Sequence, residues 1–141
     1  MSDAQLHAMA GGLHSAAIRL LRMVRREDRH TGISPPRLSA LSVLVFGGPK
    51  SLAELAAAEE VTAPTMSRIV EGLVADGLAT READRGDRRK VRIAASDEGR
   101  RRLEAARERR VRTLAARLGR LGESERRALA RGAEVLERAL R

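Results

Sequence analysis

Hydrophobic positions recur at helical spacing along most of this chain, and the pattern changes only in one central stretch. Apolar residues repeat every three or four positions from Asp3 to His30, with Gly11-Gly12 as a weak point that could kink the helix. A nearly apolar run follows Ser34-Pro35, where serine can accept an amide as N-cap, and ends at Gly47-Gly48-Pro49. The pattern therefore predicts one long amphipathic helix and then a shorter, buried one. The inward stripe of the first helix comprises Leu13, Ala17, Leu20, Leu21 and Val24.

Two short helices with clear start and stop signals come next. Ser51 and Glu54 form the two ends of a capping box, and Thr62 is placed to cap a second helix that has Pro64 in its first turn. Gly77 follows this second helix where a left-handed C-cap is wanted. Its inward stripe is Met66, Ile69, Val70 and Leu73.

The outward face of this second helix carries small and hydroxyl-bearing residues and one arginine near its N-terminal end. They are Ala63, Thr65, Ser67 and Arg68. Such residues suit insertion into the major groove of DNA. An ordinary amphipathic helix would explain the same pattern.

The period then changes from helical to alternating. The runs Leu78–Ala83 and Lys90–Ala94 predict a two-stranded hairpin with one buried face, joined by a charged tip at 84–89. We expect Asp84 and Asp87 to pair with neighbouring arginines and fix the shape of this tip. Asp87 is the only acid in a segment with five basic residues, which are Arg85, Arg88, Arg89, Lys90 and Arg92. A basic hairpin directly after a helix pair favours DNA contact, although a charged turn can also be merely solvated.

Helical spacing returns after the hairpin. Ser96 can cap a helix that runs to about Arg120, and Gly122 with Glu125 opens a last helix. Both carry narrow apolar stripes, formed by Leu103, Ala106, Val111, Leu114 and Leu118 and then by Leu129, Ala133, Leu136 and Leu140. Stripes this narrow predict packing against another long helix, in a second subunit or in an internal helical hairpin.

Composition narrows the possible partners. The chain has 141 residues with a net charge of +9, which favours a polyanion, nucleic acid first and an anionic membrane second. The surplus is almost entirely arginine, which suits phosphate and guanine contacts but could also reflect a GC-rich genome. Phe46 is the only aromatic residue, so the core must be aliphatic, as in packed helices.

Several functions are disfavoured by what the sequence lacks. The absence of cysteine excludes disulfides, thiol redox sensing and cysteine-based zinc sites. The three histidines are scattered, and no nucleophile–base set or phosphate loop is visible, so we expect no enzyme activity, no cofactor and no metal site. No apolar run approaches a membrane span, and the first residues lack a signal-peptide pattern. We therefore expect a cytoplasmic protein.

The combined pattern resembles the MarR family of bacterial transcriptional regulators. The most specific part runs from Val61 to Gly99 and is similar to the family's recognition helix and wing signature. The matching wing positions are Asp87, Arg88, Arg89, Val91, Ile93 and Gly99. The family's Leu-Thr step is Ala95-Ser96 here, and serine can still cap. Element order and length agree over nearly all 141 residues.

This resemblance implies a mainly α fold with a small β-hairpin wing: a winged helix-turn-helix with long dimerisation helices at both termini. It implies a single domain over 1–141, with the reading head at about 34–96 and the dimerisation region at 1–30 and 97–141. It also implies a homodimer on a pseudo-palindromic operator in double-stranded DNA, usually as a repressor. Carried over by position, the major-groove residues are Ala63, Pro64, Thr65, Ser67 and Arg68, and those for the minor groove or its phosphates are Arg85, Arg88 and Arg89.

Many members of the family release DNA when a small anionic or phenolic ligand binds. His14, Ser39 and Ser42 are polar candidates for lining such a pocket, although a structural role explains each of them as well. A member that responds to no ligand is also consistent with this aromatic-poor chain. The alternative to a specific regulator is a non-specific architectural protein that binds nucleic acid through its arginine-covered helices.

Overall fold

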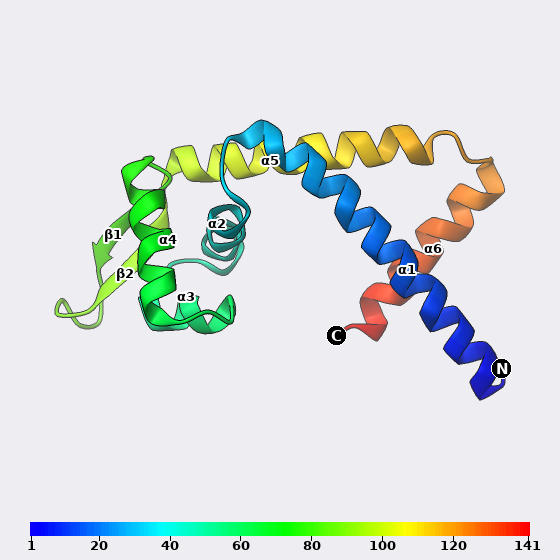
Figure 1. Cartoon of the computed structure of the whole chain (residues 1–141), viewed down its shortest axis with the longest axis horizontal. Coiled ribbons are helices and arrows are strands. Elements are labelled where there is room, and N and C mark those ends of the chain that lie inside the picture. The colour runs from blue at the N-terminus through cyan, green and yellow to red at the C-terminus, as the bar shows by residue number, and fades with distance from the viewer. The chain divides into compact units, whose positions relative to one another are not determined.

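The computed structural model describes all residues 1–141, which form six α-helices, a short 3₁₀ helix and one antiparallel two-stranded sheet (Figure 1). The elements are α1 (Asp3–Asp28), η1 (Arg29–Thr31), α2 (Pro35–Gly47), α3 (Leu52–Ala58), α4 (Ala63–Ala75), β1 (Ala79–Ala83), β2 (Val91–Ala95), α5 (Asp97–Leu118) and α6 (Glu123–Ala139). This order confirms the predicted fold class. The chain divides into two compact units, Met1–Arg107 and Glu108–Arg141. None of its helices is both long and apolar enough to cross a membrane.

Local capping chemistry sets the ends of the central helices. The Ser51 hydroxyl accepts the amide of Glu54 at 3.1 Å, and the Glu54 carboxylate accepts the amide of Ser51 at 3.1 Å, which confirms the capping box of α3. Thr62 caps α4 by accepting the amide of Thr65 at 3.4 Å. Gly77 ends that helix at φ +71°, in the left-handed region that glycine adopts without strain.

The start of α2 corrects one expectation. Ser34 occupies the N-cap position, but its side chain makes no capping hydrogen bond. Pro35 and Pro36 fill the first two helical positions, and proline has no N–H to offer. Only the Arg37 amide remains for a serine cap, and the hydroxyl does not bond to it. The two prolines fix the backbone angles at this end instead.

The core of the first unit lies where the apolar faces of α2, α3 and α4 meet β2 and the start of α5. Leu41, Leu55, Met66 and Leu73 are fully buried in it, as the helical stripes predict. Burying a side chain of this size stabilises a fold by roughly 1.5–3 kcal/mol. Aliphatic packing of these few helices therefore holds the head together without aromatic residues.

The hairpin pairs in antiparallel register, with Ala79 opposite Ala95 at its base and Ala83 opposite Val91 near its tip. The predicted single buried face is wrong for β1, since Ala79 is its only buried residue. The base of the hairpin packs against helices, whereas the outer part of β1 lies beyond the core and is exposed on both faces. An alternating sequence cannot show where along a strand the core ends.

The second edge of β2 is also covered at the base. The Lys50 amide donates to the Ile93 carbonyl at 3.0 Å, and the Ile93 amide donates to the Lys50 carbonyl at 2.7 Å. Both Ile93 and its neighbour Ala94 are buried, so β2 also departs from alternation. The segment between α2 and α3 thereby joins the hairpin base by backbone bonds.

The turn after α4 and the start of α5 form one hydrogen-bonded junction. The Ser96 hydroxyl accepts the amide of Gly99 at 3.0 Å, which confirms the predicted cap of α5, and donates to the Gly77 carbonyl at 2.6 Å. The Ser96 amide donates to the Leu78 carbonyl at 3.0 Å. Gly99 is buried against Leu78 and Leu41, where a Cβ atom would meet backbone. Only glycine fits this crossing without displacing its neighbours.

The terminal helices α1 and α6 have exposed apolar stripes. Helix α1 runs through Gly11 and Gly12 without a break, and neither α1 nor α6 contains a buried residue. Large exposed apolar side chains on these helices are Leu6, Met9, Leu13, Ile18, Leu20 and Leu21 on α1 and Leu129, Val135 and Leu136 on α6. In α5, Leu103 and Ala106 are buried, whereas Val111 in the second unit is exposed.

Candidate nucleic-acid interface

The N-terminal part of α4 presents the residues that the sequence assigned to the major groove. Ala63, Pro64, Thr65 and Arg68 are exposed, and Ser67 is half-buried. The opposite face of the helix packs into the core, so these side chains are fixed to a rigid element. The Thr62 hydroxyl donates to the Thr65 hydroxyl at 2.9 Å, so Thr65 is already held by the cap.

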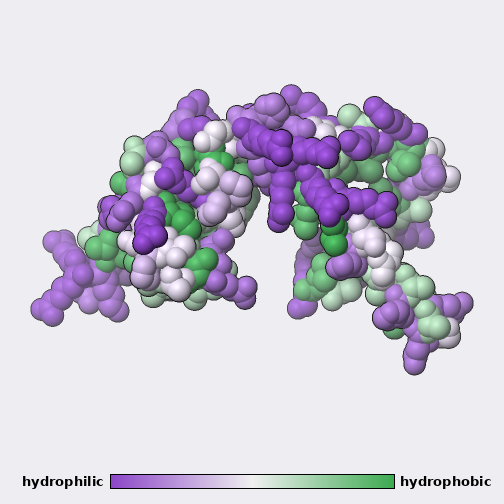
Figure 2. All heavy atoms as spheres, in the orientation of Figure 1, coloured by the Kyte–Doolittle hydropathy of each residue, from purple (hydrophilic) through white to green (hydrophobic).

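The tip of the hairpin concentrates positive charge. Arg85, Arg88, Arg89 and Lys90 are all exposed, and none of them is in an ion pair. Figure 2 shows this tip, at the left of the view, as a hydrophilic cluster. Some exposed arginines elsewhere in the protein do pair with nearby carboxylates, as Arg112 does with Glu108 at 3.5 Å. The tip therefore has an uncompensated positive surface.

Asp84 organises one side of this tip. Its carboxylate accepts the Gly86 amide at 2.8 Å, and its own amide donates to the Lys90 carbonyl at 2.9 Å. The backbone hydrogen bond from Gly86, together with the Arg92 guanidinium, lowers the pKa of Asp84 below its ordinary value of 3.8. The carboxylate is therefore ionised at neutral pH.

Asp87 organises the other side of the tip. Its carboxylate accepts the Arg89 amide at 3.0 Å, and its carbonyl accepts the Lys90 amide at 3.0 Å. The sequence predicts that both aspartates pair with neighbouring arginines, and the pairing of Asp84 with Arg92 at 3.3 Å confirms this for Asp84. For Asp87 the prediction is wrong, because its carboxylate bonds to the backbone amide of Arg89 and to no arginine side chain.

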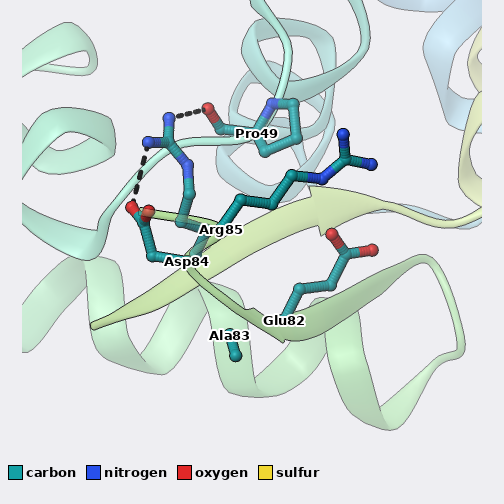
Figure 3. Close-up of a pocket in the computed structure, with 6 residues that line it drawn as sticks. Pro49, Glu82, Ala83, Asp84 and Arg85 are labelled. Carbon is teal, nitrogen blue, oxygen red and sulfur yellow. Dashed lines mark hydrogen bonds and ion pairs between the residues drawn. The ribbon is translucent and has the colours of Figure 1, made fainter. Parts of the chain in front are cut away.

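Arg92 is the residue of this region that sequence reasoning missed. Its guanidinium donates to the Pro49 carbonyl at 2.6 Å and pairs with Asp84 at 3.3 Å (Figure 3). It also lies 3.7 Å from the Glu54 carboxylate. No local pattern could single out Arg92, because its partners come from segments 8 to 43 residues away.

A hollow of about 460 Å³ opens beside Arg92. It is lined by Pro49, Glu82, Ala83, Asp84, Arg85 and Arg92. Figure 3 shows the Arg85 side chain running back over the hairpin from the tip, on the same side as Pro49. Of the three arginines that the sequence assigned to the minor groove, Arg85 is thus the one that borders this hollow.

Of the polar residues considered for an effector pocket, His14 lies on α1, whereas Ser39 and Ser42 lie together on α2. His14 and Ser39 are exposed on α1 and α2, and Ser42 uses its hydroxyl to donate to the Ser39 carbonyl at 2.8 Å. No cluster of three or more histidine, aspartate or glutamate side chains is placed to hold a metal ion. The candidate interface therefore consists of the exposed N-terminal part of α4 and the basic tip of the hairpin.

Comparisons with known proteins agree on one family. A model of the MarR family matches residues 31–90. An uncharacterized HTH-type transcriptional regulator of Mycobacterium bovis is 35% identical over 96% of this chain and 92% of its own length. A similar regulator of Mycobacterium leprae is 33% identical over the same shares.

Solved structures give the same answer. A MarR family protein from Bacillus stearothermophilus superimposes with a TM-score of 0.83 at 25% identity, covering 99% of this chain and 98% of that one. A variant of S. aureus MepR bound to an oligodeoxyribonucleotide shares the fold, with a TM-score of 0.70 at 17% identity, covering 100% and 99%. The chain belongs to the MarR family and is a transcriptional regulator with a winged helix-turn-helix fold.

Proposed function

We propose that this protein is a repressor that binds a pseudo-palindromic operator in double-stranded DNA as a homodimer. The observation that carries the proposal is the exposed N-terminal part of α4 together with a hairpin tip whose arginines lack acidic partners. A repressor acts by occupying DNA that the transcription machinery needs, so tight and sequence-selective binding is the property required. This role puts the protein with chromosomal DNA in the cytoplasm.

In this proposal α4 enters the major groove. Thr65 and Ser67 offer hydroxyl groups to base edges, and Arg68 can contact a guanine or a phosphate. Ala63 and Pro64 are small enough to let the helix approach the bases closely. The core contacts of Met66 and its neighbours keep the helix in place.

The hairpin would serve as the wing. Arg85, Arg88 and Arg89 would reach the minor groove or the phosphates beside it, where guanidinium groups replace counterions. Asp84 and Asp87 would shape the wing through their bonds to backbone amides of the tip. Because the carboxylates of Asp84 and Asp87 accept backbone amides of the tip, the guanidinium groups of the tip arginines stay available for DNA.

A second copy of the chain is the proposed occupant of the uncovered apolar stripes. Helices α1 and α6 each expose several large aliphatic side chains. Monomeric soluble proteins rarely expose large contiguous apolar patches, so each helix needs a partner surface. The chain would then be a single MarR-type domain, with the head at about 34–96 and the dimerisation region at 1–30 and 97–141. Two heads about 34–36 Å apart would engage successive major grooves.

An effector would act by changing the spacing of the two heads, which shifts the population between DNA-competent and incompetent dimers. His14, Ser39 and Ser42 stay candidate contacts for such a small molecule. The structure of an S. aureus MepR variant bound to an oligodeoxyribonucleotide supports DNA binding by a protein of this fold. Another structure of that protein contains ethidium bromide, so a protein of this fold can hold an organic ligand.

Selection from a random-sequence DNA library by the purified protein tests the proposal. We expect an enriched motif with two inverted half-sites and, at fixed salt, at least about 10³-fold tighter binding than to a scrambled duplex of equal length. Comparable affinity for both duplexes would overturn the proposal and favour the non-specific architectural protein. Purification of a monomer at micromolar concentration would overturn the dimer.

A further inference from the structure

We propose that Arg92 is a positioning residue that locks the wing against the helix-turn-helix and so sets the angle between wing and recognition helix. This inference rests on the proposed function, because it assigns Arg92 a role in presenting the DNA-binding surface. The residue belongs to neither the recognition helix nor the charged tip. Its role follows from where its three partners lie.

The guanidinium of Arg92 joins three separate segments. It donates to the Pro49 carbonyl in the segment between α2 and α3 at 2.6 Å. It pairs with Asp84, where the tip leaves β1, at 3.3 Å. The Glu54 carboxylate of α3 lies 3.7 Å away. Arginine is suited to such a junction because its planar fork can donate in several directions at once.

Two of these partners have fixed positions of their own. Glu54 is held by the capping box with Ser51, and Asp84 is held by the Gly86 amide. Both ends of the link are therefore attached to ordered backbone. Arg92 thereby links α3 to the tip through two carboxylates that each accept a backbone amide.

The outer hairpin has no other polar link to the helices. The backbone bridge between Lys50 and Ile93 is at the base, and β1 beyond Ala79 is exposed. On the tip side of Ile93, the hairpin is joined to the helix-turn-helix only by the hydrogen bond and the ion pair of Arg92. Without them, the tip could swing about the base.

The charge of Arg92 also argues against a direct DNA contact. Two carboxylates compensate it, and its side chain is 36% exposed. The tip arginines have no carboxylate partner and are exposed. Arg92 therefore differs from Arg88 and Arg89 in both respects, although all three belong to one basic run.

The test compares four variants of the full-length protein. Arg92→Gln removes the charge, and Arg92→Lys keeps the charge but loses the fork. Glu54→Gln removes one carboxylate while retaining a residue that can complete the capping box. Arg81→Gln is the matched control, since Arg81 is an exposed arginine of β1 without an ion pair. Thermal unfolding identifies variants that are not folded.

The first measurement is amide hydrogen exchange without DNA. We expect the tip amides of Gly86 and Lys90 to exchange about tenfold faster in Arg92→Gln, and to exchange at the wild-type rate in Arg81→Gln. Glu54→Gln should show a smaller increase, which keeps the test informative if Arg92→Gln does not fold. Unchanged exchange in folded Arg92→Gln or Arg92→Lys would overturn the inference. This measurement does not depend on the proposed function.

The second measurement is affinity for the duplex recovered by selection, over a range of salt concentrations. We expect Arg92→Gln to bind about tenfold more weakly, because the wing must then be ordered on binding, with an unchanged salt slope. Arg92→Lys should recover only part of the loss, and adding Glu54→Gln to Arg92→Gln should weaken binding little further. A salt slope reduced by about one, with full recovery by lysine, would instead make Arg92 a direct phosphate contact. If selection recovers no motif, the proposed function fails while the exchange result still decides the role of Arg92.

Discussion

Replacing Gly99 by alanine should destabilise the protein markedly. The added Cβ would lie 3.0 Å from the Leu78 carbonyl carbon and 3.1 Å from a methyl carbon of Leu41, and closer still to the Leu78 carbonyl oxygen. Carbon atoms pack best at about 3.5–4.0 Å, so the backbone of Leu78 or the start of α5 must move. The carbonyl that must move is the one that accepts the Ser96 amide at 3.0 Å.

The expected magnitude combines three effects. Overpacking a tight site destabilises by about 1–3 kcal/mol. Weakening the Ser96–Leu78 hydrogen bond adds about 1 kcal/mol. The better helix propensity of alanine offsets about 1 kcal/mol of this. We therefore expect Gly99→Ala to lower the free energy of unfolding by about 1–3 kcal/mol.

Urea unfolding followed by circular dichroism at one fixed protein concentration measures this change. Gly11→Ala is the matched control, because Gly11 is also inside a helix but a Cβ there has no neighbour within 4 Å. It should stabilise by about 0.5–1 kcal/mol. Equal stabilities of the two variants would refute the account of the junction between α4, the wing and α5.

Three further predictions concern the interface and its supports. Arg88→Ala should weaken operator binding by roughly 1–3 kcal/mol and reduce the salt slope by about one; an unchanged affinity and slope would remove Arg88 from the interface. Thr62→Ala should destabilise the protein by about 1 kcal/mol in urea unfolding, and Ser34→Ala by less than about 0.5 kcal/mol, since only the first residue makes a cap bond; equal losses would contradict this. The lowered pKa of Asp84 means that its ionised form stabilises the wing above pH 3.8, and that this contribution is lost as the pH falls through the folded pKa. An NMR titration of its carboxyl carbon should therefore have a midpoint below 3.8, and a midpoint at or above 3.8 would contradict the hydrogen bonds described.

The fold was largely predictable because its signals are local. Capping at Ser51, Thr62 and Ser96 depends on residues three positions apart, and the apolar stripes repeat within one helix. Ser34 shows where a local rule fails, since its hydroxyl does not bond to the Arg37 amide, the one amide that the two prolines leave for a cap. The predicted buried face of β1 is wrong for a different reason. Burial along a strand depends on how far the core extends, and an alternating sequence does not encode this.

The candidate interface was predictable only as a set of exposed positions. The N-terminal part of α4 and the basic tip follow from helix and hairpin patterns. The link through Arg92 does not, because it joins β2 to Pro49 and Glu54 across the fold. Only the folded chain shows that this arginine is paired while Arg88 and Arg89 are not.

The central claim is that two copies of the chain read two half-sites of one operator. Hydroxyl-radical footprinting of the wild-type protein on the selected duplex tests it most directly. We predict two protected patches of equal strength, related by a two-fold axis and centred about one DNA turn, 10–10.5 base pairs, apart. Protection of a single patch, or uniform protection along the duplex, would contradict the account.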